Sequence, residues 1–520
     1  MSATRDRWGS RLAIIMAVAG SAIGLGNFLR FPAKAVANGG GAFMIPYFVS
    51  FLLLGLPLMW IEWTLGRYGG GFEHGTAPGI FHSLLKKNRF VKYFGVIGIF
   101  GPLVIFIYYT YIESWTLAYS FFAVIGKYAA LTDQPAMQSF LRGFQGLEQN
   151  AFFHGFGWAY CFFLVTFFLN IFVIYYGIRG GIERLCKVAL PMLFVCAFLL
   201  VFRVFMLEPQ TSVHPDRTIL NGLGFMWNPD FTALKSARVW LEAAGQIFFT
   251  LSVGIGVILT YASYLSKTDD VVLSGLTASS TNELAEVVLG GSIIIPAAFV
   301  FFGQSEMQAI ARSGTFNLGF VTMPLVLNQL PWAGFFGFVW FLLLFLAGIT
   351  SSVSLAQPSI AFLEDEFDIT REKAVFYFGI ISFILCQPCI FLLGRGVVDE
   401  LDFWGGTFFL VVFATIEVVL FVWVFGMEKA WDEIHHGADL TLPRFYKWII
   451  KYVTPLFLFF ILGAWFWQEW MPIIFMKNVS PDCKPYILAT RMVLLLLFVL
   501  LCLLVKIAWR RKKLKGEIKP

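Results

Sequence analysis

The chain alternates long apolar stretches with short polar ones. Twelve stretches reach the length of about 20 residues that a helix needs to cross a hydrocarbon core of about 30 Å. They cover 10–37, 41–68, 90–124, 155–180, 187–209, 237–265, 273–304, 334–363, 373–392, 400–425, 446–471 and 484–508. This pattern predicts an all-α membrane protein with twelve spans. An even number of spans places both termini on the same side of the membrane.

Composition excludes a water-soluble globule. Of the 520 residues, 58% are hydrophobic and only 13% are charged, whereas soluble domains carry about 25% charged residues. The six histidines are scattered along the chain and form no catalytic constellation. A phosphate-binding loop is also missing. We therefore expect neither an enzyme nor a nucleic-acid-binding protein, but a protein that acts within the lipid bilayer.

Basic residues gather in the loop after the second span and in the C-terminal segment "KIAWRRKKLKGEIK". Because cytoplasmic loops attract Lys and Arg, this distribution predicts cytoplasmic termini. We expect the basic C-terminal segment to fix topology and to touch anionic lipid. The first residues, "MSATRDRWGSR", lead directly into the first span, so no cleaved signal peptide is expected. Short termini and a small second outer loop favour a multi-pass protein of a bacterial plasma membrane.

Two spans contain glycine pairs that weaken the helix at its middle. In "AGSAIGLGNFLRFP" the pair flanks Leu25, and in "FTLSVGIGVI" it flanks Ile255. Five spans separate the two positions, so the two segments run in opposite directions. Glycine-interrupted segments at matching places in two inverted halves point to the binding site of a transporter.

The chemistry of such breaks predicts their ligands. Glycine destabilises a helix by about 1 kcal/mol relative to alanine, and unwinding frees N–H and C=O groups that cost several kcal/mol each if left unpaired in lipid. N–H groups at helix ends suit a carboxylate, whereas freed carbonyls suit a hard cation or an ammonium group. We therefore predict a site for a zwitterion and cations. Close helix packing is the alternative reason for glycines in spans, but the neighbouring Asn27, Thr250 and Ser252 favour a site.

Several motifs together resemble the neurotransmitter:sodium symporter family, and most closely its bacterial leucine-transporting members. These motifs are "GLGNFLRFP", "NGGGAFMIPY", "GLPLMWIEWTLGRYGG", "IYYTYIESW", "QIFFTLSVGIG", "TNELAEVVLGG", "LAGITSSVS" and "LDFW". The resemblance implies the LeuT fold, which has twelve transmembrane helices, a 5+5 inverted repeat, discontinuous helices 1 and 6, and two extra C-terminal helices. It implies a single transport domain over 1–520, with repeats at 10–209 and 237–425 and two added spans at 446–508.

The resemblance also implies sites for two Na⁺ ions and an amino acid. The first sodium ion would be held by Ala22, Asn27, Thr250 and Asn282 together with the substrate carboxylate. The second would be held by Gly20, Ile23, Ala347, Thr350 and Ser351. The substrate would contact Ala22, Leu25, Gly26, Ile105, Tyr109, Phe249, Thr250, Ser252, Ile255, Ser351 and Leu355. All the implied ion ligands are oxygens, as a hard cation requires.

Glu286 lies four residues after Asn282, so the two share a helix face. A carboxylate in a membrane span is costly and is by default a functional candidate. Chloride-dependent members of the family have a neutral residue at this position. We therefore expect Glu286 to act as an internal anion, so that no chloride is required. Glu62 in the second span is expected to be a partner for the unwound backbone of span six.

The resemblance implies two gates. The outer gate would consist of Arg30, Asp402, Gln246 and Phe249, and the inner gate of Arg5, Trp8, Ser263, Tyr264 and Asp365. Ion pairs that form in one state and break in another would bias alternating access.

These expectations describe a sodium-coupled symporter that imports small neutral, mostly apolar amino acids such as leucine, alanine or methionine. Aromatic substrates and a homodimer are left open. Two alternatives also stay open at this point. One is a proton-coupled amino-acid transporter of the same fold, and the other is a membrane receptor that binds an amino acid without moving it.

Overall fold

The computed structural model describes residues 8–85, 88, 90–207, 214–231, 233–314 and 316–516 of the chain, and within these ranges it contains helices and no strand. Ten continuous helical stretches are long and apolar enough to cross a bilayer, and the bent pair Arg11–Ala22 and Gly26–Ala37, at 46° to each other, makes an eleventh. The ten are Gly41–Gly70, Val91–Val124, Gly157–Tyr175, Ile178–Phe205, Val272–Ser313, Ala333–Phe367, Arg371–Phe391, Val397–His435, Arg444–Gln468 and Lys484–Leu514.

The twelfth predicted span, 237–265, is interrupted. It consists of α12 (Ala237–Thr250) and α13 (Val257–Ala262), and residues 251–256 between them are not helical. Neither half alone has the length of a span. The observed segments therefore agree with the predicted all-α fold class of twelve spans with breaks in the first and the sixth.

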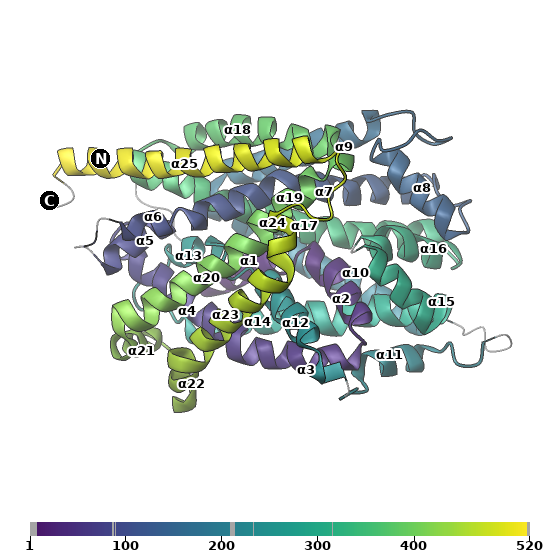
Figure 1. Cartoon of the computed structure of the whole chain (residues 1–520), viewed down its shortest axis with the longest axis horizontal. Helices are drawn as coiled ribbons and strands as arrows, with labels where there is room; N and C mark the ends of the chain where they lie inside the picture. Colours follow the sequence, from purple (N-terminus) through teal and green to yellow (C-terminus); the bar gives the residue numbers. More distant parts are fainter. Residues whose placement is uncertain are drawn as a thin grey trace.

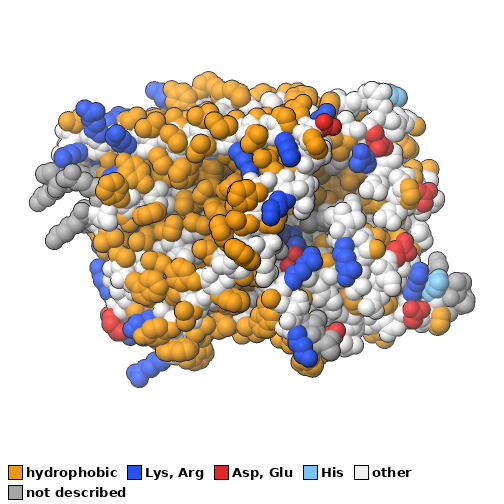
Figure 2. Space-filling view, in the orientation of Figure 1, with side chains coloured by type: hydrophobic (Ala, Val, Ile, Leu, Met, Phe, Trp, Pro, Cys, Tyr) orange, Lys and Arg blue, Asp and Glu red, His pale blue; other side chains and the backbone are white. Residues whose placement is uncertain are grey.

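The helices form an inner group and an outer layer. The long helices α7 (Ile97–Val124) and α17 (Ala333–Phe367) pack against each other, and α1 (Arg11–Ala22) and α13 both contact α17. Figure 1 shows these elements near the middle of the bundle. In the outer layer, α9 (Gly157–Tyr175), α18 (Arg371–Phe391) and α25 (Lys484–Leu514) leave many large apolar side chains exposed. Hydrophobic side chains cover much of the face in Figure 2, as expected of a surface that lies in lipid.

The remaining helices complete the spans and the loops. They are α2 (Phe31–Ala37), α3 (Gly41–Ser50), α4 (Leu56–Gly70), α5 (Ala77–Leu84), α6 (Val91–Phe94), α8 (Gln134–Phe144), α10 (Glu183–Phe205), α11 (Ile219–Trp227), α14 (Val272–Glu283), α15 (Gly291–Ser313), α16 (Met323–Asn328), α19 (Val397–Leu401), α20 (Phe409–Val419), α21 (Met427–His435), α22 (Arg444–Trp448), α23 (Thr454–Trp465) and α24 (Met471–Ile474). Short π-helical turns join several of them, among them η1 (Gly26–Arg30), η5 (Leu284–Gly290) and η8 (Asp402–Phe408).

The basic C-terminal segment makes ion pairs with other parts of the protein. At the end of α25, Lys512 Nζ lies 2.7 Å from Glu366 Oε2, and Glu366 Oε1 lies 3.0 Å from His74 Nδ1. Lys515 pairs with Asp368 just beyond α17. The segment therefore joins the C-terminal end of α17 to the loop before α5.

Candidate functional site

The break in the first span keeps its freed N–H groups hydrogen-bonded to side chains. After α1 ends at Ala22, the backbone N–H of Gly24 donates to Asn27 Oδ1 at 2.9 Å. The N–H of Leu25 donates to the hydroxyl of Tyr109 on α7 at 3.0 Å. The chain then continues directly into η1, so the break is short and its hydrogen bonds use side chains that lie within the bundle.

The break in the sixth span is longer and conformationally strained. Ser252, Gly254 and Gly256 have φ angles of 54°, 74° and 90°, a region that L side chains rarely adopt. A Cβ atom at Gly254 would lie 2.5 Å from the carbonyl oxygen of Leu410, and one at Gly256 would lie 2.4 Å from that of Gly98. The second glycine pair is therefore required both by backbone angle and by close packing.

The freed backbone of this second break has a carboxylate partner. The N–H of Gly254 donates to Glu62 Oε1 at 2.5 Å, which confirms the expected contact between the second span and the break. The two breaks also touch each other, because the Ser252 hydroxyl donates to the carbonyl oxygen of Ser21 at 3.1 Å. Peptide groups of both interrupted spans thus face one small polar region in the middle of the bundle.

A first cluster of oxygens lies between the two breaks. Asn27 Nδ2 donates to Asn282 Oδ1 at 2.8 Å, and Asn282 Nδ2 donates to the Thr250 hydroxyl at 2.9 Å. In the opposite orientation of the Asn282 amide, its nitrogen lies 3.3 Å from the carbonyl oxygens of both Ala22 and Thr250. In this second orientation the amide nitrogen donates to both carbonyls and the amide oxygen accepts from the Thr250 hydroxyl at 2.9 Å, so the whole side chain is satisfied. The Ala22 and Thr250 carbonyl oxygens therefore both face the Asn282 amide. With its oxygen turned toward them, the spacing would fit an octahedron edge of ~3.3–3.7 Å around a hard cation with ligands at ~2.3–2.6 Å.

A second cluster of oxygens lies between α1 and α17. The Ser351 hydroxyl is 3.4 Å from the carbonyl oxygen of Gly20, 3.1 Å from that of Ser21 and 3.1 Å from that of Ala347. The Thr350 hydroxyl donates to the same Ala347 carbonyl at 3.2 Å. Ile23, also expected here, lies in the break at the end of α1 and is fully buried. The structure thus brings oxygens from a broken helix and an intact helix together.

Glu286 is buried next to the first oxygen cluster. Its carboxylate accepts hydrogen bonds from Gln246 Nε2 at 2.8 Å and from the Tyr47 hydroxyl at 3.2 Å, and it also accepts from the Thr250 hydroxyl. As the spacing of four residues predicts, Glu286 and Asn282 lie on one face and both contact Thr250.

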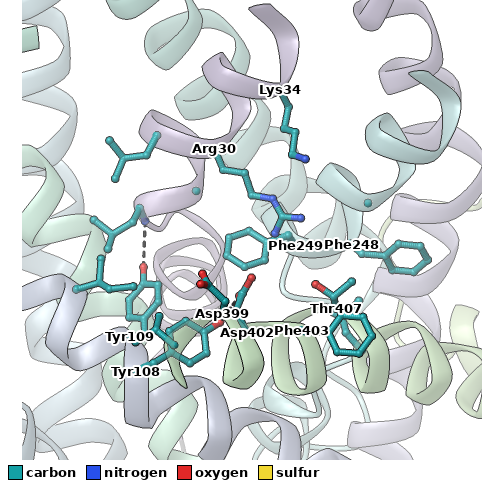
Figure 3. A pocket seen from close by; sticks show the side chains of 18 of the residues that line it. Arg30, Lys34, Tyr108, Tyr109, Phe248, Phe249, Asp399, Asp402, Phe403 and Thr407 are labelled. Atoms are coloured by element: carbon teal, nitrogen blue, oxygen red, sulfur yellow. Dashed lines mark hydrogen bonds between the residues drawn. The ribbon is translucent and has the colours of Figure 1, made fainter. Parts of the chain in front are cut away.

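A cavity of about 570 Å³ opens above the breaks (Figure 3). Four of the predicted substrate contacts line it, namely Leu25, Gly26, Tyr109 and Phe249. Of the predicted side-chain pocket, Phe249 lines this cavity, whereas Ile105, Ile255 and Leu355 are buried and do not line it. The Phe249 ring packs against the first break, since a Cβ on Gly26 would lie 2.6 Å from that ring.

The predicted outer-gate residues Arg30 and Asp402 both line the cavity, but among the described residues they form no ion pair with each other. The Arg30 guanidinium lies 4.4 Å from the centre of the Phe249 ring, and Asp402 accepts a hydrogen bond from the Tyr108 hydroxyl at 2.6 Å. Figure 3 shows Arg30 reaching down from the first span toward Phe249, with Asp402 on the facing helix. Gln246 donates to Glu286 and does not line the cavity.

The predicted inner-gate residues lie around the end of α13. Trp8 Nε1 donates to the carbonyl oxygen of Tyr261 at 3.0 Å, and the Ser263 hydroxyl donates to that of Thr260 at 2.7 Å. The Tyr264 hydroxyl accepts from Gln357 Nε2 at 3.1 Å. Asp365 is half-buried near the end of α17, and Arg5 lies outside the described residues.

Sequence reasoning missed several buried carboxylates. Both carboxylate oxygens of Glu113 on α7 accept from Asn170 Nδ2 at 3.2 Å, and the half-buried Glu283 accepts from the Tyr47 hydroxyl at 2.9 Å. Glu417 on α20 is fully buried. The general rule that a carboxylate in a span is a functional candidate would have found all three.

The fold and these clusters define a polytopic membrane transporter with a central polar site between two interrupted spans. The model of the sodium:neurotransmitter symporter family matches residues 5–130 and 126–512. The chain therefore belongs to the sodium:neurotransmitter symporter family, whose members are sodium-dependent transporters and not enzymes.

Individual relatives agree with this assignment. An uncharacterized sodium-dependent transporter of Methanocaldococcus jannaschii is 32% identical over 460 residues, which cover 87% of this chain and 89% of the relative. The sodium- and chloride-dependent glycine transporter 2 of Xenopus laevis is 26% identical over 542 residues, covering 91% of this chain and 65% of that protein. The crystal structure of MhsT in complex with L-phenylalanine superposes with a TM-score of 0.75 at 27% identity, covering 88% of this chain and 99% of the other.

Proposed function

We propose that the protein is a sodium-coupled symporter that imports small neutral, mostly apolar amino acids by alternating access. The observation that carries this proposal is the convergence of the Ala22 and Thr250 carbonyl oxygens with the Asn282 amide between the two breaks. Carbonyl and amide groups that gather at the ends of two broken helices in a membrane interior are a setting that suits a hard cation.

The first cluster would hold one Na⁺ through Ala22, Asn27, Thr250 and Asn282. The substrate carboxylate would complete this coordination, because the amides of Leu25 and Gly26 and the Tyr109 hydroxyl lie beside it. Sodium and substrate would then each tighten the binding of the other, since such coupling is reciprocal. A second Na⁺ would bind the oxygens of Gly20, Ile23, Ala347, Thr350 and Ser351, which join α1 to α17.

The substrate ammonium group would meet the carbonyls of Ala22, Phe249 and Thr250 and the hydroxyl of Ser252. Its side chain would enter the pocket of Ile105, Phe249, Ile255 and Leu355, with Tyr109 and Ser351 on the polar side. These apolar walls support neutral substrates from alanine to leucine and methionine. The relative solved with L-phenylalanine supports the inclusion of aromatic side chains.

Glu286 would replace chloride. Its buried carboxylate contacts Thr250 directly, so a fixed negative charge lies next to the first sodium site without any added anion. Replacing Glu286 with serine should make uptake depend on chloride. The same uptake with and without chloride in that variant would refute this part of the proposal.

The separated Arg30 and Asp402 and the open cavity are what an outward-facing state would have before the outer gate closes. We place the protein in a bacterial plasma membrane with both termini in the cytoplasm, and we leave a homodimer open.

Uptake into proteoliposomes tests the function. Accumulation of radiolabelled leucine or phenylalanine against a gradient, only with Na⁺ outside, is the expected result. Accumulation driven by a proton gradient without Na⁺ would support a proton-coupled transporter, and sodium-dependent binding without accumulation would support a receptor. Thr350→Ala is expected to weaken sodium dependence, whereas Thr277→Ala, which removes an exposed hydroxyl bonded only within α14, is the matched control.

A further inference from the structure

A buried carboxylate lies next to the second oxygen cluster without belonging to it. Glu113 on α7 is 0% exposed. A Cβ on Gly348 of α17 would lie 2.9 Å from Glu113 Cγ and 3.7 Å from its Cδ, so this side chain packs directly on the backbone of α17. Gly348 directly follows Ala347. The Ala347 carbonyl oxygen accepts from the hydroxyls of Thr350 and Ser351 at 3.2 Å and 3.1 Å, so the carboxylate meets α17 at the residue next to a proposed sodium ligand.

A chain of hydrogen bonds makes a second connection to the same stretch of α17. Both carboxylate oxygens of Glu113 accept from Asn170 Nδ2 at 3.2 Å. Asn170 Oδ1 in turn accepts from the Ser352 hydroxyl at 2.6 Å, and Ser352 directly follows Ser351. Successive residues of an α-helix point about 100° apart, so Gly348 and Ser352 lie on the face of α17 next to the one that carries the cluster.

The hydrogen bonds of Glu113 compensate an ionised carboxylate poorly. Asn170 Nδ2 also donates to the Thr166 carbonyl oxygen at 3.0 Å, so one N–H is left for the two carboxylate oxygens. Among the described residues no cationic side chain pairs with Glu113. A carboxylate in this setting is costly in a membrane interior unless a positive charge lies nearby.

The second oxygen cluster has the opposite need. The carbonyl and hydroxyl groups that would bind the second Na⁺ are all neutral. The first cluster differs, because the carboxylate of Glu286 contacts Thr250 there. A cation in the second cluster therefore needs a negative charge from outside its own ligands.

The helices that pack against α17 offer few carboxylates for this purpose. Helices α1, α9, α13, α16 and α25 contain none, and the acidic residues of α17 itself lie at its end, at 364–366. Glu372 lies in the first turn of α18. Glu183 begins α10 and pairs with Lys187 at 2.6 Å. Within this group of described helices, Glu113 is the carboxylate that lies in the middle of a span.

We propose that Glu113 supplies the negative charge that compensates a Na⁺ ion in the second oxygen cluster. The inference deepens the proposed function and rests on it, since it requires that this cluster binds sodium. Glu113 touches neither the ion nor the substrate and acts across the backbone of α17, whose Cα cylinder is about 4.6 Å wide. Salt screens buried charges much less than exposed ones. The carboxylate and the ion therefore stabilise each other, and the coupling is reciprocal.

Three substitutions of Glu113 separate its charge from its shape. Glu113→Gln removes the charge and keeps an oxygen that accepts from Asn170. Glu113→Met removes the charge and the hydrogen bonds with an apolar side chain of similar volume, a replacement that buried ionic positions often tolerate. Glu113→Asp keeps the charge. The control is Glu148→Gln, which removes an outer-loop carboxylate that pairs with Arg142.

Binding of ²²Na⁺ to the purified full-length protein, without any amino acid, tests the charge. Thr350→Ala, which lacks a proposed ligand of the second cluster, identifies the part of the binding curve that belongs to this cluster. For this part we expect the dissociation constant to rise about tenfold or more in Glu113→Gln and in Glu113→Met. Glu113→Asp and Glu148→Gln should remain close to the wild type.

Either charge-free variant that folds decides the question, because wild-type ²²Na⁺ affinity in it would overturn the proposal. A loss in Glu113→Met but not in Glu113→Gln would show that the hydrogen bonds matter and not the charge, and would overturn it as well. A loss in Glu113→Asp as large as in Glu113→Gln would have the same consequence.

Binding of radiolabelled leucine separates a lost charge from a deformed substrate site. Leucine binding by Glu113→Gln should be weak at low Na⁺ and recover in saturating NaCl, because the substitution changes the affinity for the ion. Failure to recover would mean that Tyr109, one helical turn away on α7, had been displaced, and would overturn the charge role. If the wild type bound no ²²Na⁺, the proposed function itself would fail. If it bound ²²Na⁺ and both charge-free variants bound it equally well, only the role of Glu113 would be lost.

Discussion

The two interrupted spans differ in how their breaks are built. The break in the first span is short, has no positive φ angle among its residues and is bonded by Asn27 and Tyr109. The break in the sixth span has three residues with positive φ and one backbone bond to a buried carboxylate. Side chains of Asn27 and Tyr109 hold the first break. The second break is held by the positive φ angles of its own backbone.

The helices α1 and α13, which flank the two breaks, are attached in correspondingly different ways. Carbonyl oxygens of α13 and of its C-cap Ser263 touch glycines of α4, since a Cβ on Gly66 would lie 2.4 Å from the Leu259 oxygen and one on Gly70 2.1 Å from the Ser263 oxygen. The start of α1 is held by charged side chains. Arg11 pairs with Asp270 at 2.8 Å and also with Asp439. Close backbone packing resists motion, whereas polar contacts at a partly exposed end can be exchanged for water. We infer that α13 is the fixed half and α1 is the half that moves.

Gly256→Ala should produce the largest effect, because it attacks the rigid break. Its φ of 90° costs an alanine about 1–3 kcal/mol, and the new Cβ would lie 2.4 Å from the Gly98 carbonyl oxygen. We expect sodium-dependent amino-acid binding to fall by more than about hundredfold. Gly24→Ala in the other break is the comparison, because its Cβ would meet only the Ser351 and Tyr109 hydroxyls, at 2.9 Å. Equal losses in the two variants would remove the proposed difference between the breaks.

Asn27→Ala should have the next largest effect. It removes the acceptor for the Gly24 N–H and the donor to Asn282. Loss of buried hydrogen bonds of this kind costs about 1–3 kcal/mol, so the apparent sodium affinity is expected to fall about tenfold or more. Sodium titrations of leucine binding measure this. Asn38→Ala, which removes only a bond to the Lys34 carbonyl at the end of the same span, should leave the titration unchanged.

The two breaks could be predicted from the sequence. Close helix packing explains single glycines in spans, but it gives no reason for two glycine pairs at matching places in two inverted halves. The oxygen clusters were predicted only through family resemblance. The contact between Glu113 and Asn170 was not predictable, since it joins residues from the third and fourth spans and depends on how the helices pack. Gln246 shows the same limit. It was expected at the outer gate, but helix α12 turns its amide toward Glu286.

Arg11→Ala should have a moderate effect and tests whether α1 is the moving half. Cys186 is a natural reporter, because it is fully buried and its sulfur would lie 3.2 Å from a Cβ on Gly20 of α1. Weakening the pairs with Asp270 and Asp439 should increase maleimide labelling of Cys186 several-fold, and sodium should reduce it again. Mass spectrometry separates this site from the exposed Cys161.

The control for this experiment is Arg142→Ala, which breaks an ion pair with Glu148 in the outer loop. Its Cys186 labelling should equal that of the wild type. If Arg11→Ala also labelled like the wild type, α1 would be held by its packing, as α13 is, and the inferred asymmetry between the two halves would be lost.

Asp368→Asn should have the smallest effect, because its ion pair lies away from both breaks. The hydrogen bond from Lys515 lowers the pKa of Asp368 below its usual 3.8. A depressed pKa contributes stability at pH values above about 3.8 that is lost as the pH falls through the folded-state pKa. The two side chains are 60% and 46% exposed, so solvent screening limits this contribution to about 0–1 kcal/mol. Asparagine tolerates the positive φ of 55° at this position, so the substitution changes the charge alone.

Thermal unfolding at pH 7 should therefore differ from the wild type by only a degree or two, less still at high salt, and not at all below the folded-state pKa. Cys186 labelling and sodium affinity should match the wild type. The result separates charge pairs that hold α1 from charge pairs that only fasten the C-terminal segment. If Asp368→Asn raised Cys186 labelling as much as Arg11→Ala does, then an ion pair remote from both breaks would control the pathway, and the distinction between a mobile α1 and a fixed α13 would lose its basis.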